Sequence, residues 1–312
     1  MAFYRQSWIP DVEWVKRGLM FEPAGQAQWI GTHAALPVMQ PIGDRHRLFL
    51  SSRDSRGRSH IGFVELSLDH PLEVLALSSG PVISPGPLGT FDDAGVTSSC
   101  VVDHGGCLDF FYTGWSLGAS VPFYLNVGLA RSEDGGRSFR KISPAPLLDR
   151  SSVDPYLTAS PWVIIENGTC RMWYVSGTEW THSAAGPRHR YHIKYAESSD
   201  GLRWNRRGVV CIDYHSPDEH AFGRPCIVRC GDRYRMWYSY RGTSYRIGYA
   251  ESSDGIVWTR MDAESALDVS DTGWDSEMVT YPLVISHRDR LHMLYNGNGY
   301  GRTGIGLAWA TA

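Results

Sequence analysis

Short stretches in which apolar and polar residues alternate, separated by turn-forming residues, run along the whole chain. No window has the apolar spacing i, i+3, i+4, i+7 of an amphipathic helix. The 33 Gly and 17 Pro are spread through the sequence as turn punctuation. The pattern therefore predicts an all-β chain made of many short strands.

One hairpin motif recurs. The sequence YAESSDG occupies residues 195–201 and again 249–255, and a third copy, LARSEDG, occupies residues 129–135. Asp-Gly between two alternating strands is a strong hairpin signal, and the Ser and Asp side chains can cap the turn's own backbone amides. An aromatic residue follows each copy and begins the outgoing strand: Phe139, Trp204 and Trp258.

Two further elements repeat in the same order, five times each. One is a strand with five copies, at residues 47–53, 108–114, 171–177, 235–241 and 292–297. The other precedes it at equivalent positions: Pro37, Ser99, Pro161, Pro225 and Pro282. Five repeated units predict a five-bladed β-propeller of four-stranded antiparallel blades, forming a single domain over residues 1–312.

The two ends of the chain complement each other. Residues 304–309 match the third strand of a unit and no fourth strand follows, whereas residues 13–18 (EWVKRG) resemble the outer strand at 203–208 (RWNRRG). We predict that residues 12–22 pair beside residues 303–310. Residues 1–24 would then supply the closing strand of the fifth blade and cover an edge that would otherwise be open.

Composition narrows the class of protein. The 312 residues are 42% hydrophobic, which allows a large core, and the net charge of −3 without any basic run argues against nucleic acid as a partner. No apolar run is long enough for a membrane span, and the N-terminus lacks the pattern of a signal peptide, so we expect a cytoplasmic protein. The six cysteines form no CxxC pair, so a zinc site is not expected, and we expect no other metal and no cofactor.

Acidic residues recur at one place in the repeat. Seven positions before the aligned Pro37, Ser99, Pro161, Pro225 and Pro282 stand Ile30, Asp92, Asp154, Asp218 and Asp275, and neighbouring acids add Asp93, Glu219 and Glu277. Inner strands of a propeller converge, so these carboxylates are predicted to line a central acidic cavity. Like charges held together raise one another's pKa, which suggests a functional use. The alternative is that each Asp caps the loop before its strand.

Other candidate ligand groups lie on the same elements. His33, Arg53, His220, Arg224, Arg241 and Tyr281 would bind substrate, and an arginine there would form an ion pair or hold a carboxylate or phosphate. Trp115 and Trp180 are candidates for stacking on sugar rings, as are Trp274 and Tyr300. Asn298 is a further candidate contact. The expected partner is a carbohydrate or glycoconjugate.

Several stretches carry a family resemblance: residues 89–96 (GTFDDAGV), 154–161 (DPYLTASP), 191–198 (YHIKYAES), 235–242 (RMWYSYRG), 273–278 (GWDSEM) and 293–301 (MLYNGNGYG). The chain resembles the five-bladed propeller glycosidase superfamily of β-fructosidases, arabinanases and mannoside phosphorylases. It is most similar to an uncharacterised bacterial glycosylase-like branch. The resemblance covers nearly the whole chain.

The resemblance implies candidate catalytic residues. Hydrolases of the superfamily use an Asp in the first blade, an Asp in the second or third and a later Glu, and the matches by position are Asp92 or Asp93, Asp154 and Glu219. The first blade departs from this pattern because it carries His33 and no acid. Phosphorylases of the superfamily need only one acid. They hold phosphate with Arg and His, for which the chain offers His33, Arg53, His220, Arg224 and Arg241.

The leading hypothesis is cleavage of a glycosidic bond by inversion. Glu219 would be the general acid, its pKa raised by Asp218 and Asp154, with Asp154 or Asp93 as base and with Asp275 and Glu277 binding sugar hydroxyls. One alternative is a non-hydrolytic sugar-processing enzyme, either a phosphorylase or a modifier of activated sugars. The other is a carbohydrate-binding propeller that has lost catalysis.

Overall fold

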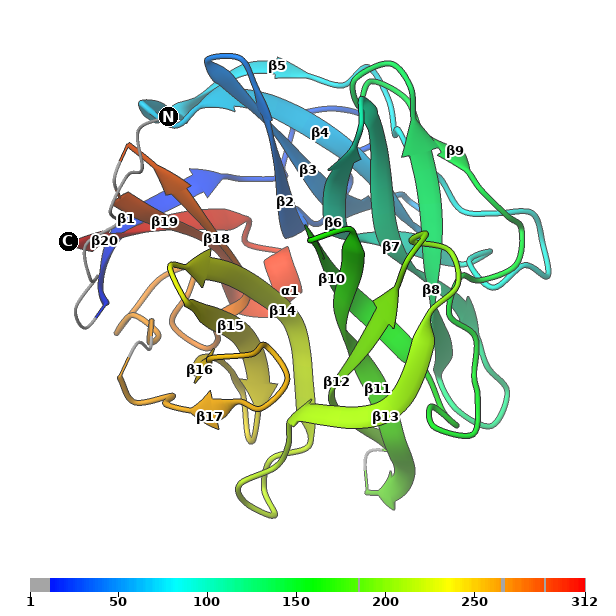
Figure 1. The fold of residues 1–312 in the computed structure, drawn as a ribbon. Coiled ribbons are helices and arrows are strands. Elements are labelled where there is room, and N and C mark those ends of the chain that lie inside the picture. Colours follow the sequence, from blue (N-terminus) through cyan, green and yellow to red (C-terminus); the bar gives the residue numbers. More distant parts are fainter. Residues whose placement is uncertain (1–11, 185, 265–266, 289, 312) are drawn as a thin grey trace.

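The computed structural model describes residues 12–184, 186–264, 267–288 and 290–311. The strands form one four-stranded sheet and two eight-stranded sheets, and in each larger sheet two antiparallel groups of four strands meet at one parallel bridge. We describe these groups of four as units, in chain order (Figure 1). The first contains β2 (Ala35–Ile42), β3 (Arg45–Arg53), β4 (Ser59–Ser67) and β5 (His70–Leu77). The second contains β6 (Gly95–His104), β7 (Cys107–Leu117), β8 (Phe123–Ser132) and β9 (Arg140–Lys141).

The remaining strands continue this arrangement. The third unit contains β10 (Thr158–Glu166), β11 (Thr169–Ser183), β12 (Gly186–Ser198) and β13 (Asn205–Ile212). The fourth contains β14 (Ala221–Cys230), β15 (Arg233–Arg241), β16 (Tyr245–Ser252) and β17 (Thr259–Arg260). The fifth contains β18 (Thr280–His287), β19 (Arg290–Asn296) and β20 (Ile305–Thr311), with the short helix α1 (Asn298–Gly301) between the last two.

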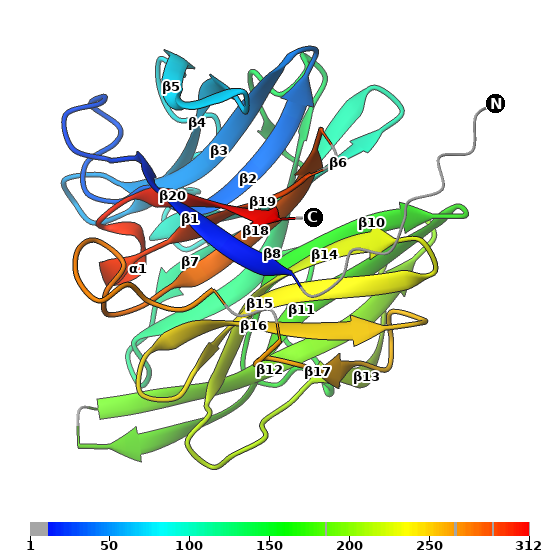
Figure 2. The ribbon, with the colours of Figure 1, turned by 90° about the vertical axis from the view of Figure 1, so that its left-hand side faces the viewer.

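The fourth strand of the fifth unit comes from the beginning of the chain. β1 (Glu13–Phe21) pairs antiparallel with β20, with Trp14 opposite Ala310 and Phe21 opposite Ile305 (Figure 2). The predicted pairing of residues 12–22 with 303–310 is thus confirmed. Residues 1–11, included in the predicted closing strand, lie outside the described residues.

The first strand of each unit carries a bulge in its first half. Four residues there have a positive φ although they are not glycine, and the register of the strand pairing shifts beside them: Leu36, Ser160, Arg224 and Tyr281. All four precede a proline, which disfavours the right-handed helical region. A bulge aims side chains out of the regular alternation of a strand, and three of these four line the pocket described below.

The bulges also connect neighbouring units. The backbone N–H of a residue at the bulge donates to a side chain on the second strand of the preceding unit: Leu36 to Asn296 Oδ1, Ser98 to Ser51 Oγ, Ser160 to Thr113 Oγ1 and Tyr281 to Ser239 Oγ. The first of these bonds, 2.9 Å long, joins the fifth unit to the first. One hydrophobic cluster likewise combines Leu48 of the first unit, Trp237 of the fourth and Leu294 of the fifth.

The predicted Asp-Gly turns are confirmed. In the turn after β12, Asp200 Oδ1 accepts from the backbone N–H groups of Leu202 and Arg203, at 2.8 Å each. The Ser198 hydroxyl accepts from the N–H of Gly201. Asp134 and Asp254 cap their turns in the same way. Among the described residues, no helix has the length and apolar character needed to cross a membrane.

Candidate functional site

A pocket of about 410 Å³ lies where the five units meet. Its lining includes residues from all five units, among them the bulge residues Leu36, Ser160 and Tyr281 and the helix residue Tyr300. Figure 2 shows α1 and the adjoining ends of β11 and β12 on the same side of the molecule. This volume suits a ligand larger than a single small ion.

One side of the pocket carries positive charge and phenol groups. Arg53 ends β3, and Arg241 ends β15. Arg241 Nη1 donates to the Tyr300 hydroxyl at 3.1 Å, and its guanidinium lies 5.4 Å from the ring centre of Tyr245. Both arginines also act electrostatically on the hydroxyl of Tyr281, which lines the same pocket.

Two histidines line the pocket in their neutral form. Burial, aided by Arg53 and Arg302, lowers the pKa of His33 to about 4. Burial, aided by His220 and Arg241, lowers the pKa of His189 to about 4 as well. An uncharged imidazole at neutral pH can accept or donate a hydrogen bond and can accept a proton.

The wall near His189 is aromatic. The His189 ring stacks on Tyr191 with ring centres 4.8 Å apart, and the Tyr191 and Tyr245 hydroxyls are 2.8 Å apart. Burial raises the pKa of both phenols, so they remain protonated and act as hydrogen-bonding groups.

Part of the wall formed by the second and third units is apolar. Phe123 and Leu125 on β8 line it together with Ala159 on β10 and Val175 on β11. Trp180 packs behind this wall, 5.3 Å from Phe123 between ring centres, and is not itself a lining residue. Hydroxyls of the inner strands complete the lining: Ser51, Ser52, Ser59, Thr97, Thr113 and Ser160.

No Asp or Glu lines this pocket within the described part of the chain, so it is not the acidic cavity expected from the sequence. Asp92, Asp154 and Asp275 are at most 2% exposed and lie inside their own units. Each accepts from a tyrosine of the second strand, at 2.9–3.2 Å, and from a cation on the outermost strand. The tyrosines are Tyr112, Tyr174 and Tyr295, and the cations are Lys141, Arg206 and Lys16.

The other polar candidates have local partners or face solvent. Asp93 accepts from the Gly89 N–H at 2.9 Å and caps a turn. Asn298 Oδ1 accepts from the N–H groups of Glu277 and Met278, and its amide donates to Gly273 O. The Asp218 and Glu277 side chains are exposed. In the fourth unit Asp262, rather than Asp218, accepts from the second-strand tyrosine, Tyr238.

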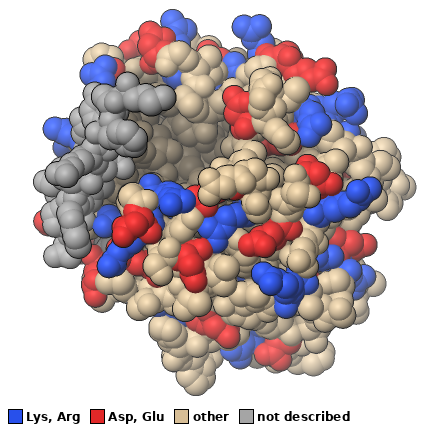
Figure 3. Space-filling view, viewed as in Figure 1, with Lys and Arg blue, Asp and Glu red and all other residues tan. Residues whose placement is uncertain are grey.

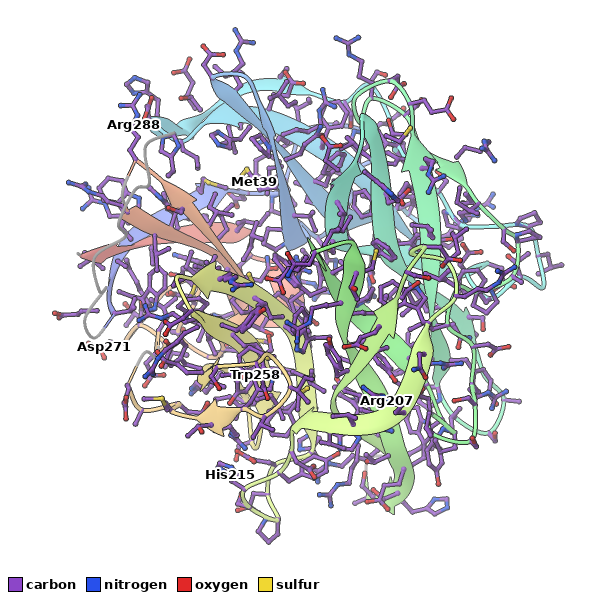
Figure 4. All side chains as sticks on the ribbon, viewed as in Figure 1. Met39, Arg207, His215, Trp258, Asp271 and Arg288 are labelled. Carbon is purple, nitrogen blue, oxygen red and sulfur yellow. The ribbon has the colours of Figure 1, made fainter. Side chains whose placement is uncertain are left out.

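Glu219 is held by an arginine. Arg260 donates to both carboxylate oxygens, at 2.7 and 2.9 Å, and the His215 N–H donates to one of them at 2.7 Å. Figure 4 shows His215 at the outer edge of the molecule. Burial alone would raise the pKa of Glu219, but these bonds outweigh it and lower the pKa below its ordinary value. The sequence had suggested a raised pKa, as a general acid needs.

His220 and Arg224 lie beside the pocket without lining it. His220 Nδ1 accepts from Arg188, and its backbone N–H donates to Arg241 O. Arg224 is 0% exposed and donates to the backbone oxygens of Pro37 and Ser99, on two other units. These bonds hold the Arg224 guanidinium inside the protein, away from the pocket lining.

Of the residues predicted to bind substrate, the structure brings six together at the pocket: His33, Arg53, Trp115, Arg241, Tyr281 and Tyr300. Sequence reasoning missed His189, Tyr191, Tyr245, Phe123 and Leu125, which also line it. His189 and Tyr191 could have been found because the strand at 186–198 begins several residues before the shared repeat, and both residues lie in this additional part. Among the described residues, no three His, Cys, Asp or Glu side chains gather closely enough to hold a metal ion.

Charged side chains elsewhere are mixed in sign. Figure 3 shows acidic and basic residues interspersed over one face, without a continuous field of either sign. The pocket differs from this face because its lining contains two arginines and, among the described residues, no acidic side chain.

No family model matches the chain. Two proteins of Mycobacterium tuberculosis, the uncharacterized proteins MT1551 (strain CDC 1551) and Rv1502 (strain H37Rv), are each 42% identical to it over 296 residues. The match covers 95% of this chain and 98% of each relative.

Solved structures share the fold at lower sequence identity. One glycoside hydrolase has a TM-score of 0.74 and 17% identity, over 95% of this chain and 91% of its own. A thermostable family-43 glycoside hydrolase has a TM-score of 0.66 and 17% identity, over 93% and 91%. The β-1,2-mannobiose phosphorylase from Listeria innocua, with β-1,2-mannobiose, has 0.67 and 13%, over 89% of each. The protein thus has the all-β propeller fold of glycoside hydrolase-like proteins, as the resemblance noted in the sequence implied.

Proposed function

The chain belongs to the same family as MT1551 and Rv1502 of M. tuberculosis, and we propose that it is a sugar-processing enzyme whose pocket handles a negatively charged reactant. The observation that carries this proposal is the pocket lining: two arginines, two neutral imidazoles and several phenols, with no carboxylate among the described residues. Fold likeness alone does not fix a reaction, so the argument rests on these side chains.

The finer architecture is part of the proposal. We take the five units to be the blades of one propeller domain, closed by β1. The pairing of β1 with β20 and the bond from Leu36 N–H to Asn296 support closure from the outer and the inner side. Closure matters for function because it places Arg53 of the first unit and Tyr281 of the fifth in one pocket.

The reaction favoured by this lining is transfer of a glycosyl group to or from phosphate. Arg53 and Arg241 would hold the phosphate, since guanidinium groups match its geometry. In such a step an oxygen of dihydrogen phosphate bonds to the anomeric carbon as the glycosidic C–O bond breaks, and a proton of the phosphate passes to the leaving oxygen. No carboxylate is then needed to activate water. His33 and His189 would orient sugar hydroxyls or relay that proton.

The test is turnover of a glycoside panel with and without inorganic phosphate, following sugar phosphate and free reducing sugar separately. We expect phosphate-dependent turnover that falls at least tenfold, about 1.4 kcal/mol, in Arg241→Gln. Arg203→Gln, a change of an exposed arginine in a distant turn, serves as the matched control and should keep full activity. Turnover that ignores phosphate, or an unaffected Arg241→Gln, would contradict the proposal.

Hydrolysis by inversion is the second candidate, favoured by the likeness to glycoside hydrolase folds. It requires Glu219 to leave Arg260 and act as an acid. Release of reducing sugar without phosphate, abolished in a folded Glu219→Gln variant, would select it. A fully active Glu219→Gln protein would exclude Glu219 as the acid.

A further inference from the structure

The pocket has two chemically different sides, and we infer that its ligand is an amphipathic anion: a sugar compound with a negatively charged group at one end and an apolar group at the other. This inference rests on the proposed function, of which it names the substrate class. The charged group would lie at Arg53 and Arg241. The apolar group would lie against Phe123, Leu125 and Val175.

The arginines of the pocket differ from most arginines inside the fold. Arg47, Arg131 and Arg260 each pair with a carboxylate at 2.6–2.7 Å. Within the described residues, neither Arg53 nor Arg241 forms an ion pair with an acidic side chain. The Nε of Arg241 is also buried without a hydrogen-bond partner there, a feature that it shares with the Nε of Arg47 and of Arg224. Because Arg241 lines the pocket, a ligand can supply the missing acceptor. An anionic ligand supplies both the charge and the acceptor.

The apolar side is equally well defined. Ala159 and Val175 are 4% and 2% exposed, and they form a cluster with Leu157 against which Phe123 and Leu125 pack. Phe123 and Leu125 are only half-buried, so they present apolar surface to the pocket. A fully hydroxylated sugar would leave this surface without a matching group, whereas an aryl or alkyl substituent would cover it.

The two sides come from different units. Phe123, Leu125 and Val175 lie on β8 and β11 of the second and third units, whereas Arg53 ends β3 of the first unit and Arg241 ends β15 of the fourth. Figure 1 shows β8 and β11 to the right of the centre, with β3 above it and β15 to its lower left. A ligand that extends from the arginines to β8 and β11 therefore meets both charge and apolar surface.

The test measures binding by isothermal titration, without requiring turnover. The probes are inorganic phosphate, methyl phosphate, butyl phosphate and phenyl phosphate. We expect phenyl or butyl phosphate to bind at least about tenfold more tightly than methyl phosphate, because the larger group covers the apolar wall. The order of phenyl and butyl phosphate distinguishes an aromatic from an aliphatic substituent, and either order supports the inference.

Two pairs of variants separate the contributions. Phe123→Ala should weaken phenyl and butyl phosphate and leave methyl phosphate unchanged, whereas Val257→Ala, in an exposed distant turn, should change nothing. Arg241→Gln should weaken all four probes, with Arg203→Gln as its control. Leu125→Ala repeats the first test if Phe123→Ala does not fold.

Equal affinity for methyl and phenyl phosphate would overturn the inference, as would the absence of binding by any phosphate ester. Neither result depends on whether glycosides are turned over. Failure of this inference is thus distinguishable from failure of the proposed function, which the turnover assay decides.

Discussion

At the scale of single residues, His189 couples the pocket to pH. Its pKa is about 4 in the folded protein, because of burial and the nearby His220 and Arg241, against about 6.5 in an unfolded chain. Between these values the unfolded chain binds a proton that the folded protein does not. The free energy of unfolding therefore decreases as the pH falls from about 6.5 towards 4.

Replacing His189 by Gln removes this proton uptake. We expect the variant to lose less stability than the parent between pH 7 and pH 5, measured by urea unfolding at both values. His182→Gln, a change of an exposed histidine on the same hairpin, is the control and should behave like the parent. Equal acid sensitivity of His189→Gln and the parent would show that the folded protein protonates His189 normally.

The residue scale is also where prediction from sequence reached its limit. The recurrence of Asp92, Asp154 and Asp275 was visible in the sequence. A repeat does not show, however, whether a side chain points into the central pocket or into its own unit. Their partners, such as Lys141 and Lys16, lie on outermost strands 49 and 259 positions away in the sequence. Local spacing cannot reveal such partners, so the sequence predicted that these carboxylates line a cavity, whereas the structure pairs them with cations inside their units.

At the scale of elements, the attachment of β1 depends on an ion pair between a partly exposed lysine and a buried aspartate. Lys16 Nζ lies 2.7 Å from Asp275, which is 2% exposed and also accepts from Tyr295. Lys16→Met leaves this carboxylate without its cation, so we expect a loss of roughly 3 kcal/mol in the free energy of unfolding. Lys141→Met, which removes the equivalent partner of Asp92, should cost a similar amount.

Chemical denaturation of both variants checks this prediction. Arg17→Met is the matched control on the same strand, because Arg17 stacks on Trp309 without a buried acid to neutralise, and it should cost less than about 1 kcal/mol. If Lys16→Met were as stable as the parent while Lys141→Met was not, β1 would not be an integral outer strand.

Elements were predictable where residues close together in the sequence determine their structure. Asp-Gly with a preceding Ser specifies the turns at 132–138, 198–203 and 252–257 through bonds between residues close in sequence. The complementarity of the chain ends likewise identified the β1–β20 pair. The sequence analysis did not use the length of β11 and β12 beyond the repeat. It therefore missed His189 and Tyr191, which lie in the additional part of β12 and line the pocket.

At the scale of the whole molecule, the inner strands meet at Arg224. Its guanidinium donates to Pro37 O on β2 and Ser99 O on β6, and lies 5.9 Å from the ring centre of Trp162 on β10. One side chain of β14 thus contacts three other units. Burial lowers its pKa to about 10, which leaves it charged at neutral pH. A shared contact of this kind favours unfolding of the units together.

Arg224→Met tests this coupling. The change leaves two buried carbonyls without donors, at about 1–3 kcal/mol each, and removes a buried charge, which recovers part of that cost. We expect a net loss of about 2 kcal/mol, with tryptophan fluorescence and far-ultraviolet circular dichroism still tracing one coincident urea transition. The exposed change Arg203→Met should leave the midpoint unmoved. Unchanged stability would mean that Arg224 does not tie the units together, and separate transitions in the parent protein would mean that the units unfold independently.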